Sequence, residues 1–207
     1  MIYNTILIRL IEVQLKKYYN KENRESYNTT LNWGLKLGIL ISLPTTIGLI
    51  LLAEPILITL LQYKEFSAND VNMTAISLIA FSLGLPGMIG SKILITNYYS
   101  RKDTRYPVKA ALIAVICNFI LNILFVIYLV KTNFNGAHVG LALATSISAY
   151  VNFYFLFKTA IKTKILELDK SIKNILFKST ISTFIMSAFI LYFDLDKNSW
   201  IYLDLFE

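Results

Sequence analysis

The one unpaired charge deep inside a long apolar stretch of this sequence is Lys92, in the run 72–99. An ammonium at the centre of a bilayer costs on the order of 3 kcal/mol, so such residues usually face a cavity and mark a substrate path. A second interpretation is open, because Lys92 lies only seven residues before Tyr99 and could extend its stem to the membrane surface. The residues alone do not decide between these two roles.

Other polar groups in the apolar runs are few. Asn118 and Asn122 lie four residues apart, hence on one face of a helix, where asparagines most often form interhelical hydrogen bonds. The single His138 is expected at the surface rather than in a proton relay, and the single Cys117 excludes an intrachain disulfide or a CxxC metal site. No serine–histidine–acid set, phosphate loop or paired-carboxylate motif occurs, so we expect no enzyme activity.

The elements that must position these residues are long apolar runs. Four runs carry almost no charge and a fifth resembles them after Lys178: 37–61, 72–99, 108–130, 137–157 and 175–193. Each is near the length that crosses a bilayer as a helix. Sixteen of the 20 basic residues lie in alternate flanking segments, before the first run, after the second and after the fourth, against three in the other segments. Basic segments stay in the cytoplasm, which predicts five crossings with the N-terminal segment inside.

The composition agrees with an all-α polytopic membrane protein of about five transmembrane helices. It is 56% hydrophobic and 16% charged, with a mean hydropathy of +0.57. A soluble helical protein would keep polar faces on its helices, which these runs lack. The net charge of +7 is confined to alternate segments, which favours membrane topology and anionic lipid over nucleic acid. Arg101, Lys102 and Arg105 are most simply topology determinants, with lipid headgroup contact as the alternative.

Local signals divide the chain into four segments. Residues 1–30 form a cytoplasmic or interfacial segment, 31–158 four membrane helices, 159–174 a basic cytoplasmic linker, and 175–207 a further membrane helix with a short outer tail. In the first helix, Pro44 predicts a kink and Glu54-Pro55 a second break. Asn69 and Asp70 are candidate caps for the second helix, and the GLPG group at 84–87 should bend it. The first 15 residues predict an interfacial helix or the tail of an earlier span.

Two motifs resemble the MurJ/MviN family of lipid II flippases, within the multidrug/oligosaccharidyl-lipid/polysaccharide exporter superfamily. One is the ninth-helix region, LNWGLKLGILISLPTTIGLILLAEPILITLLQYKEF, and the other is GLPGMIGSKILITNYYSRKDTRYPVK. The segment HVGLALATSIS is similar to the family's twelfth helix, and the resemblance covers about residues 20–160. Two departures are Lys64, where the family usually has glycine, and residues 8–12, where it has a proline-bearing helix end.

The resemblance implies a fourteen-helix fold of two six-helix lobes and a final pair, of which this chain would hold helices nine to thirteen. The arginine-rich first lobe, which faces the substrate pyrophosphate, would be missing. The chain is therefore interpreted as a C-terminal fragment, a split gene product or a degraded copy. A separate chain carrying the first lobe is then a possible partner.

The resemblance also implies site residues. Lys92 matches a functionally important family lysine and would contact the lipid-linked pyrophosphate from the cavity. Some members bind sodium with polar residues of helices eleven and twelve; by that resemblance Asn118, Asn122, the Leu141 carbonyl and Thr145 would be ligands. Asn122 stands where those members have an acidic residue, so the charge of the site is lost. Sodium as a coupling ion is the only metal or cofactor implied.

The implied function is translocation of the lipid-linked peptidoglycan precursor (lipid II) across the bacterial inner membrane by alternating access, with this chain as part of one lobe. The partners would be that precursor and membrane lipids, without nucleic acid. Two alternatives are open. One is a related polysaccharide-lipid flippase or multidrug exporter, and the other is a non-transporting membrane remnant.

Overall fold

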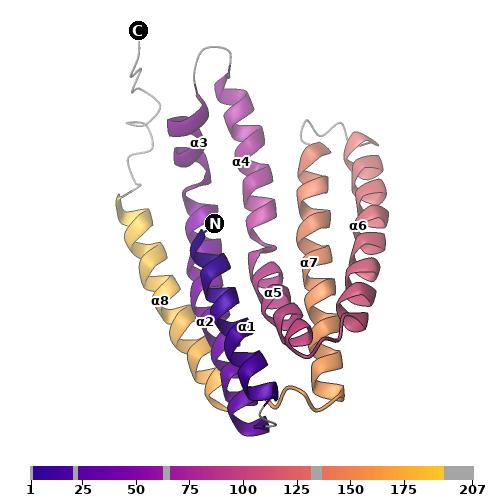
Figure 1. Cartoon of the computed structure of the whole chain (residues 1–207). Coiled ribbons are helices and arrows are strands. Elements are labelled where there is room, and N and C mark those ends of the chain that lie inside the picture. Colours follow the sequence, from indigo (N-terminus) through magenta and orange to yellow (C-terminus); the bar gives the residue numbers. More distant parts are fainter. Residues whose placement is uncertain (1, 21–22, 63–65, 132–136, 194–207) are drawn as a thin grey trace.

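Helices make up all the regular structure in a computed structural model that describes residues 2–20, 23–62, 66–131 and 137–193 (Figure 1). This confirms the all-α prediction. The helices are α1 (Ile2–Asn20), α2 (Arg24–Leu51), α3 (Ala53–Leu61), α4 (Ala68–Ser82), α5 (Leu85–Ser100), α6 (Arg105–Lys131), α7 (Ala137–Lys162) and α8 (Ser171–Phe193). Four of them, α2, α6, α7 and α8, are long and apolar enough to cross a membrane, and the bent pair α4–α5 would make the fifth predicted span.

The helices form a row in which α8 and α6 lie at opposite ends (Figure 1). α8 packs on α2, α2 packs on α5, and α5 packs on α7, which also contacts α4 and α6. α1 runs beside α2 and α5 and buries Ile11 and Leu15. This arrangement fits the tail of a span better than a helix that lies in the membrane plane.

One end of the row collects the basic segments that the charge pattern assigned to the same membrane side. The C-terminal ends of α1, α5 and α7 and the N-terminal ends of α2, α6 and α8 all lie there (Figure 1). We call this the basic end. Lys64 and the expected outer tail after residue 193 lie outside the described residues.

The first expected span is interrupted where a proline requires it. α2 runs through Pro44 without a break, and the chain leaves the helix at Leu52, between α2 and α3. Pro55 has no N–H to give to the Leu51 carbonyl, and its ring crowds that carbonyl. The break predicted at Glu54-Pro55 therefore appears one turn earlier in the chain, at the residue that the proline affects.

The second expected span bends by 41° between α4 and α5, as the GLPG group predicted. Pro86 cannot donate to the Ser82 carbonyl, and Gly84 N bonds to Phe81 O at 3.0 Å instead of continuing the α-helical pattern. Such a bend exposes carbonyls that lipid cannot satisfy. A neighbouring helix must therefore cover it.

Hydroxyl groups of α7 cover the bend. Ser146 Oγ donates to Ala80 O at 2.6 Å, with Phe81 O a second acceptor at 3.2 Å, and Tyr150 Oη donates to Leu83 O at 2.8 Å. The interface between α7 and the α4–α5 pair therefore supplies the hydrogen bonds that the bend removed.

Two glycines allow this close approach. A Cβ added at Gly84 would lie 2.8 Å from Ser146 Cα, and one at Gly87 would lie 3.0 Å from Tyr150 N. Both neighbours are backbone atoms, which cannot rotate away. The glycines of the GLPG group thus serve helix packing as well as the bend.

The start of α4 differs from the sequence-based expectation of Asn69 and Asp70 as caps. Ser67 is the N-cap, and Asp70 is the third residue of the helix. The Ser67 hydroxyl accepts from Asp70 N at 3.4 Å, and Ser67 N donates to Asp70 Oδ2 at 3.0 Å. This is a capping box, in which Asp70 takes part as the third helical residue. The sequence offered Ser67, Asn69 and Asp70 within four positions, and only the backbone geometry selects the cap.

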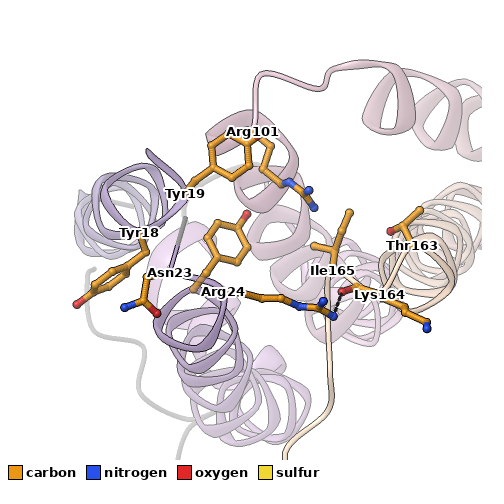
Figure 2. Close-up of a pocket in the computed structure, with 9 residues that line it drawn as sticks. Tyr18, Tyr19, Asn23, Arg24, Arg101, Thr163, Lys164 and Ile165 are labelled. Carbon is orange, nitrogen blue, oxygen red and sulfur yellow. Dashed lines mark hydrogen bonds between the residues drawn. The ribbon is translucent and has the colours of Figure 1, made fainter. Parts of the chain in front are cut away.

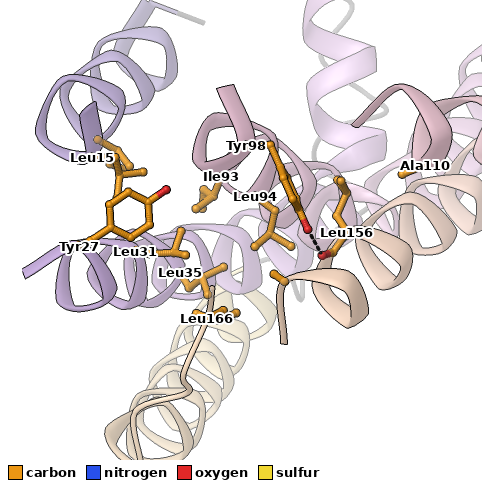
Figure 3. Packing of buried hydrophobic residues seen from close by; sticks show 12 residues of the cluster. Leu15, Tyr27, Leu31, Leu35, Ile93, Leu94, Tyr98, Ala110, Leu156 and Leu166 are labelled. Atoms are coloured by element: carbon orange, nitrogen blue, oxygen red, sulfur yellow. Dashed lines mark hydrogen bonds between the residues drawn. The ribbon is translucent and has the colours of Figure 1, made fainter. Parts of the chain in front are cut away.

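The largest buried cluster lies towards the basic end and joins α1, α2, α5, α6 and α7 with Leu166 after α7 (Figure 3). Tyr98 of α5 is fully buried there, and its hydroxyl donates to Leu156 O of α7 at 3.1 Å. The remaining buried members are Ile11, Leu15, Tyr27, Leu31, Leu35, Ile93, Leu94, Ala110, Ala160 and Leu166. Helices distant in sequence therefore share their largest buried cluster at this end.

Side-chain amides of α2 hold the non-helical link between α7 and α8. Asn28 exchanges two hydrogen bonds with the backbone of Glu167, each 3.0 Å long. Asn32 Nδ2 donates to Glu167 O at 2.8 Å and its Oδ1 accepts from Asp169 N at 3.2 Å. Lys36 then pairs with Asp169 at 2.5 Å. Because these residues recur every four positions, one face of α2 fixes the start of α8.

Candidate functional site

Lys92 projects from an open face of α5. Its side chain is exposed, whereas the next two residues, Ile93 and Leu94, are 2% and 0% exposed. No hydrogen bond or ion pair joins the Lys92 ammonium to any part of the chain that the structure describes. The residue lies two turns after the bend and about 10 Å along the helix axis from Tyr99. An exposed position at this depth is compatible both with a cation that faces a cavity and with a lysine that extends to the membrane surface.

The four residues proposed as sodium ligands come together between α6 and α7. Asn122 Nδ2 donates to Asn118 Oδ1 at 2.9 Å, and Asn118 Nδ2 lies 3.3 Å from Thr145 Oγ1 and 3.3 Å from Ser148 Oγ. Thr145 Oγ1 donates to Leu141 O at 2.9 Å. The network therefore also provides the interhelical hydrogen bonds of the alternative interpretation.

The chemistry of this cluster fits a monovalent cation only in part. Its oxygens are the hard ligands that sodium prefers, and no donor within the described residues reaches the buried Asn122 Oδ1. Every one of these oxygens is neutral. In the described ranges no group of three or more His, Cys, Asp or Glu side chains could hold a metal ion. A cation here would therefore need its counter-charge from elsewhere.

His138 lies at the start of α7 and is exposed, as expected for a surface residue. Its Nε2 is 3.1 Å from Met73 O of α4. The contact joins α4 and α7 at the end opposite the basic end. Among the described residues, no second titratable group is hydrogen-bonded to His138, as a proton relay would require.

A cavity that the sequence did not predict lies at the basic end (Figure 2). Its volume is about 680 Å³, and it is lined by Tyr18, Tyr19, Asn23, Arg24, Tyr27, Arg101, Thr163, Lys164 and Ile165. Arg24 reaches across it to the Lys164 carbonyl at 3.1 Å. The available signal was the repeated pairing of tyrosines with basic residues, KKYYN at the end of α1 and NYYSRK at the end of α5.

The floor of this cavity is fixed by buried hydrogen bonds. The Tyr27 hydroxyl lies 2.6 Å from Asn97 Oδ1 and 3.0 Å from Ser100 Oγ. Asn97 is fully buried and Tyr27 is 6% exposed. α2 and α5 therefore keep one relative position beneath the cavity.

Comparison with known proteins gives a consistent result. The family model described as "Lipid II flippase MurJ" matches residues 4–207, a wider range than the motifs at 20–160 suggested. A "Probable lipid II flippase MurJ" of Haemophilus influenzae is 32% identical over 180 residues, which cover 87% of this chain and 34% of that protein. A protein of the same name from Rickettsia prowazekii is 32% identical over 188 residues, which cover 91% of this chain and 35% of that protein.

A solved structure agrees with these relatives. "Lipid II flippase MurJ, inward closed conformation" matches with a TM-score of 0.68 and 28% identity, over 88% of this chain and 38% of that one. The chain therefore spans about a third of the length of the curated relatives it matches.

Proposed function

This chain belongs to the lipid II flippase MurJ family, and from that premise we propose that it forms part of one lobe of a transporter for the lipid-linked peptidoglycan precursor. Its apolar helices and its relatives make it a multi-pass protein of the inner membrane. The proposed orientation places the basic end in the cytoplasm. Transport is not a bond-making reaction, so no catalytic residue is assigned.

The observation that carries the proposal is the open face of the bent α4–α5 pair with Lys92 on it. Transporters commonly bind substrates beside interrupted helices, at the interface between two lobes. Lys92 is the one charged residue of α5 within its membrane-spanning part, and the described helices leave it exposed. A compact ammonium suits phosphate oxygens, so Lys92 would contact the pyrophosphate as the lobes change position.

The rest of the relatives' length would have to supply the second lobe, within the same polypeptide or as a separate chain. Alternating access needs two surfaces that move about a shared site. Purified chain in liposomes should therefore not translocate labelled lipid II. Robust translocation by this chain alone would contradict the two-lobe proposal and point to a dimer.

The test of function is complementation of a strain depleted of its lipid II flippase, with the first lobe supplied. Growth would support lipid II as the substrate, whereas a polysaccharide-lipid flippase, a multidrug exporter or an inactive remnant should not restore it. In that strain Lys92→Ala should abolish growth, and Lys92→Arg should restore it partly, because a guanidinium places its donors differently. Normal growth with Lys92→Ala at matched abundance would show that the lysine only snorkels.

The buried, unpaired Asn122 oxygen supports a second element of the proposal, a sodium ion held by Asn118, Asn122, the Leu141 carbonyl and Thr145. Sodium should then raise the unfolding temperature of the purified chain more than potassium does. Asn122→Ala should remove the difference. Thr159→Ala should keep it, because Thr159 lies about four turns beyond Thr145 on α7 and its hydroxyl donates to Phe155 O. Equal effects of the two cations on the parent chain would leave the cluster as a packing network.

A further inference from the structure

The cavity at the basic end has the chemistry of an anion site. Its nine lining residues include two arginines and one lysine and no carboxylate. Three tyrosines and a threonine add hydroxyl groups, and Asn23 adds an amide. We propose that this cavity binds an anionic phosphate group, provided by the headgroup of a membrane lipid or by a soluble phosphate, with Arg101 as its principal ligand.

Arg101 is held in place without being neutralised. Its guanidinium lies 5.4 Å from the centre of the Tyr19 ring, a stacking contact that orients the planar group (Figure 2). No ion pair joins it to a carboxylate within the described ranges. A planar guanidinium can donate two parallel hydrogen bonds to phosphate oxygens.

Asp103 is a carboxylate that could compete for Arg101. It lines an adjoining cavity of about 240 Å³ together with Arg101, Tyr19 and Tyr106. Asp103 Oδ1 already accepts from Arg105 N at 3.2 Å, in the turn that begins α6. Asp103 forms no ion pair with Arg101 within the described ranges, so the N–H groups of the guanidinium remain available to an external anion.

Arg24 provides a second group from the opposite wall. Its Nη2 bonds to the Lys164 carbonyl at 3.1 Å and to Glu167 at 2.5 Å. Both members of the ion pair are largely exposed, at 68% and 65%, so the pair is weak and can rearrange. The remaining N–H groups of the guanidinium have no partner among the described residues and can serve an anion.

Three helices, α1, α5 and α7, end at this cavity, and their C-terminal partial charges would repel an anion unless compensated. The ends of α5 and α7 are closed by the same bond pattern: Asp103 N to Tyr98 O with Lys102 N to Tyr99 O, and Ile165 N to Ala160 O with Lys164 N to Ile161 O. These bonds engage the last carbonyls.

The residue in the left-handed conformation is a lysine at both ends, Lys102 with φ of 56° and Lys164 with φ of 52°, where glycine is usual. Each lysine places a positive charge beside the negative end of a helix dipole. The Lys164 ammonium points away from Arg24 in Figure 2, so it is assigned this compensating role and not that of a ligand.

The location fits a lipid phosphate. The nine lining residues lie in the end turns of helices at the basic end or within three residues of those ends, and a membrane helix ends at the level of the headgroups. Basic pockets between membrane helices at this depth bind anionic headgroups. The volume of about 680 Å³ is that of a small-molecule site.

The test uses the whole chain in nanodiscs of phosphatidylcholine, with or without phosphatidylglycerol, and counts retained lipids by native mass spectrometry. Phosphatidylglycerol should be retained in preference, and Arg101→Gln should lower this retention about tenfold, the loss expected for a charge-assisted hydrogen bond. Arg105→Gln removes the same charge from an exposed residue outside both cavities and should retain the lipid as the parent does. Arg101→Lys should fall between, because it cannot stack on Tyr19 in the same way.

Labelling of the unmodified chain with phenylglyoxal gives a second measurement that does not depend on folding of a variant. Phosphatidylglycerol should slow modification of Arg101 and leave Arg105 unaffected. If millimolar inorganic phosphate protects Arg101 equally, the phosphate source is soluble; protection by the lipid alone identifies the headgroup. The proposal would be overturned if Arg101 were modified at the same rate without an anion, with phosphatidylglycerol and with inorganic phosphate. Equal lipid retention by Arg101→Gln and Arg105→Gln would also overturn it.

Discussion

The two faces of α7 pack against their neighbouring helices through different kinds of contact. Towards α4 and α5, close contact depends on the lack of a side chain at Gly84 and Gly87. It also depends on α7 hydroxyl groups that bond to backbone carbonyls of the bend. Towards α6, a glycine also allows close approach, but its neighbours are side chains: a Cβ at Gly140 would lie 2.8 Å from Phe125 Cβ. Asn118 of α6 is also bonded to Thr145 and Ser148. Backbone atoms cannot be repositioned locally, whereas side chains can change rotamer. The first interface should therefore be rigid and intolerant of substitution, and the second adjustable.

The largest effect is expected from Gly84→Ala. The added methyl would lie 2.8 Å from Ser146 Cα, so α5 and α7 must separate, at a cost of about 1–3 kcal/mol. The control is Gly48→Ala, whose nearest contact would be Met186 Cε at 3.7 Å. This variant should be neutral or stabilising by about 0.5–1 kcal/mol, as alanine is in a helix. Unfolding in detergent followed by circular dichroism measures both, and equal stabilities would contradict a rigid interface.

Ser146→Ala and Ser148→Ala make the same change on opposite faces. Ser146 carries the hydrogen bond to the buried Ala80 carbonyl, and its removal should cost about 1–2 kcal/mol because lipid offers no replacement. Ser148 bonds within its own helix to Thr145 O and accepts from Asn118, so its removal should cost about 0.5 kcal/mol. The same unfolding measurement compares them. A larger loss for Ser148→Ala would reverse the assignment of the two faces.

Smaller effects are expected within the polar face itself. Asn118→Leu breaks bonds to Thr145 and Ser148 of α7 and removes the oxygen that accepts from Asn122 Nδ2. It should cost about 0.6 kcal/mol, the average for interhelical hydrogen bonds in membranes. Asn122→Leu removes one bond together with an oxygen that lacks a donor in the described chain, so it should lie within about 0.5 kcal/mol of the parent. If Asn122→Leu lowered the free energy of unfolding more than Asn118→Leu does, the unpaired oxygen would be shown to bind a ligand.

The smallest effect lies outside both faces, in the link that follows α7. Hydrogen bonds from Lys36 and then from Ser171 hold the pKa of Asp169 well below its usual value. Because the folded-state pKa is depressed, the stabilisation is present above about pH 4, the unfolded pKa, and is lost as pH falls towards the folded value. Unfolding temperatures measured from pH 5 downward should show this decline in the parent and less of it in Asp169→Asn. Identical declines would place the titrating group elsewhere.

Residue spacing was sufficient for several features of the fold. The four candidate spans with the bent pair α4–α5 follow from hydropathy. The bend at 84–87 and the break near Pro55 follow from the missing proline N–H, which acts within one turn of the chain. The capping residue of α4 was assigned to Asn69 and Asp70 instead of Ser67, because several polar residues there can serve and only backbone geometry selects one. The proximity of Asn118, Asn122 and Thr145 came from family resemblance, since no spacing rule joins α6 to α7.

The sequence by itself determined which helices are long and apolar enough to cross a membrane and which of their ends lie together. A bilayer requires long apolar helices and keeps basic segments on one side. Hydropathy and charge can therefore be read segment by segment along the chain, without knowledge of the contacts between helices. Only the tertiary structure decided which face of α7 meets which neighbour, because small residues fit against any closely packed helix. It also decided that Tyr19, Arg24 and Arg101 surround one cavity. Those residues come from three helices, and the contacts between helices, rather than any local pattern, bring them together.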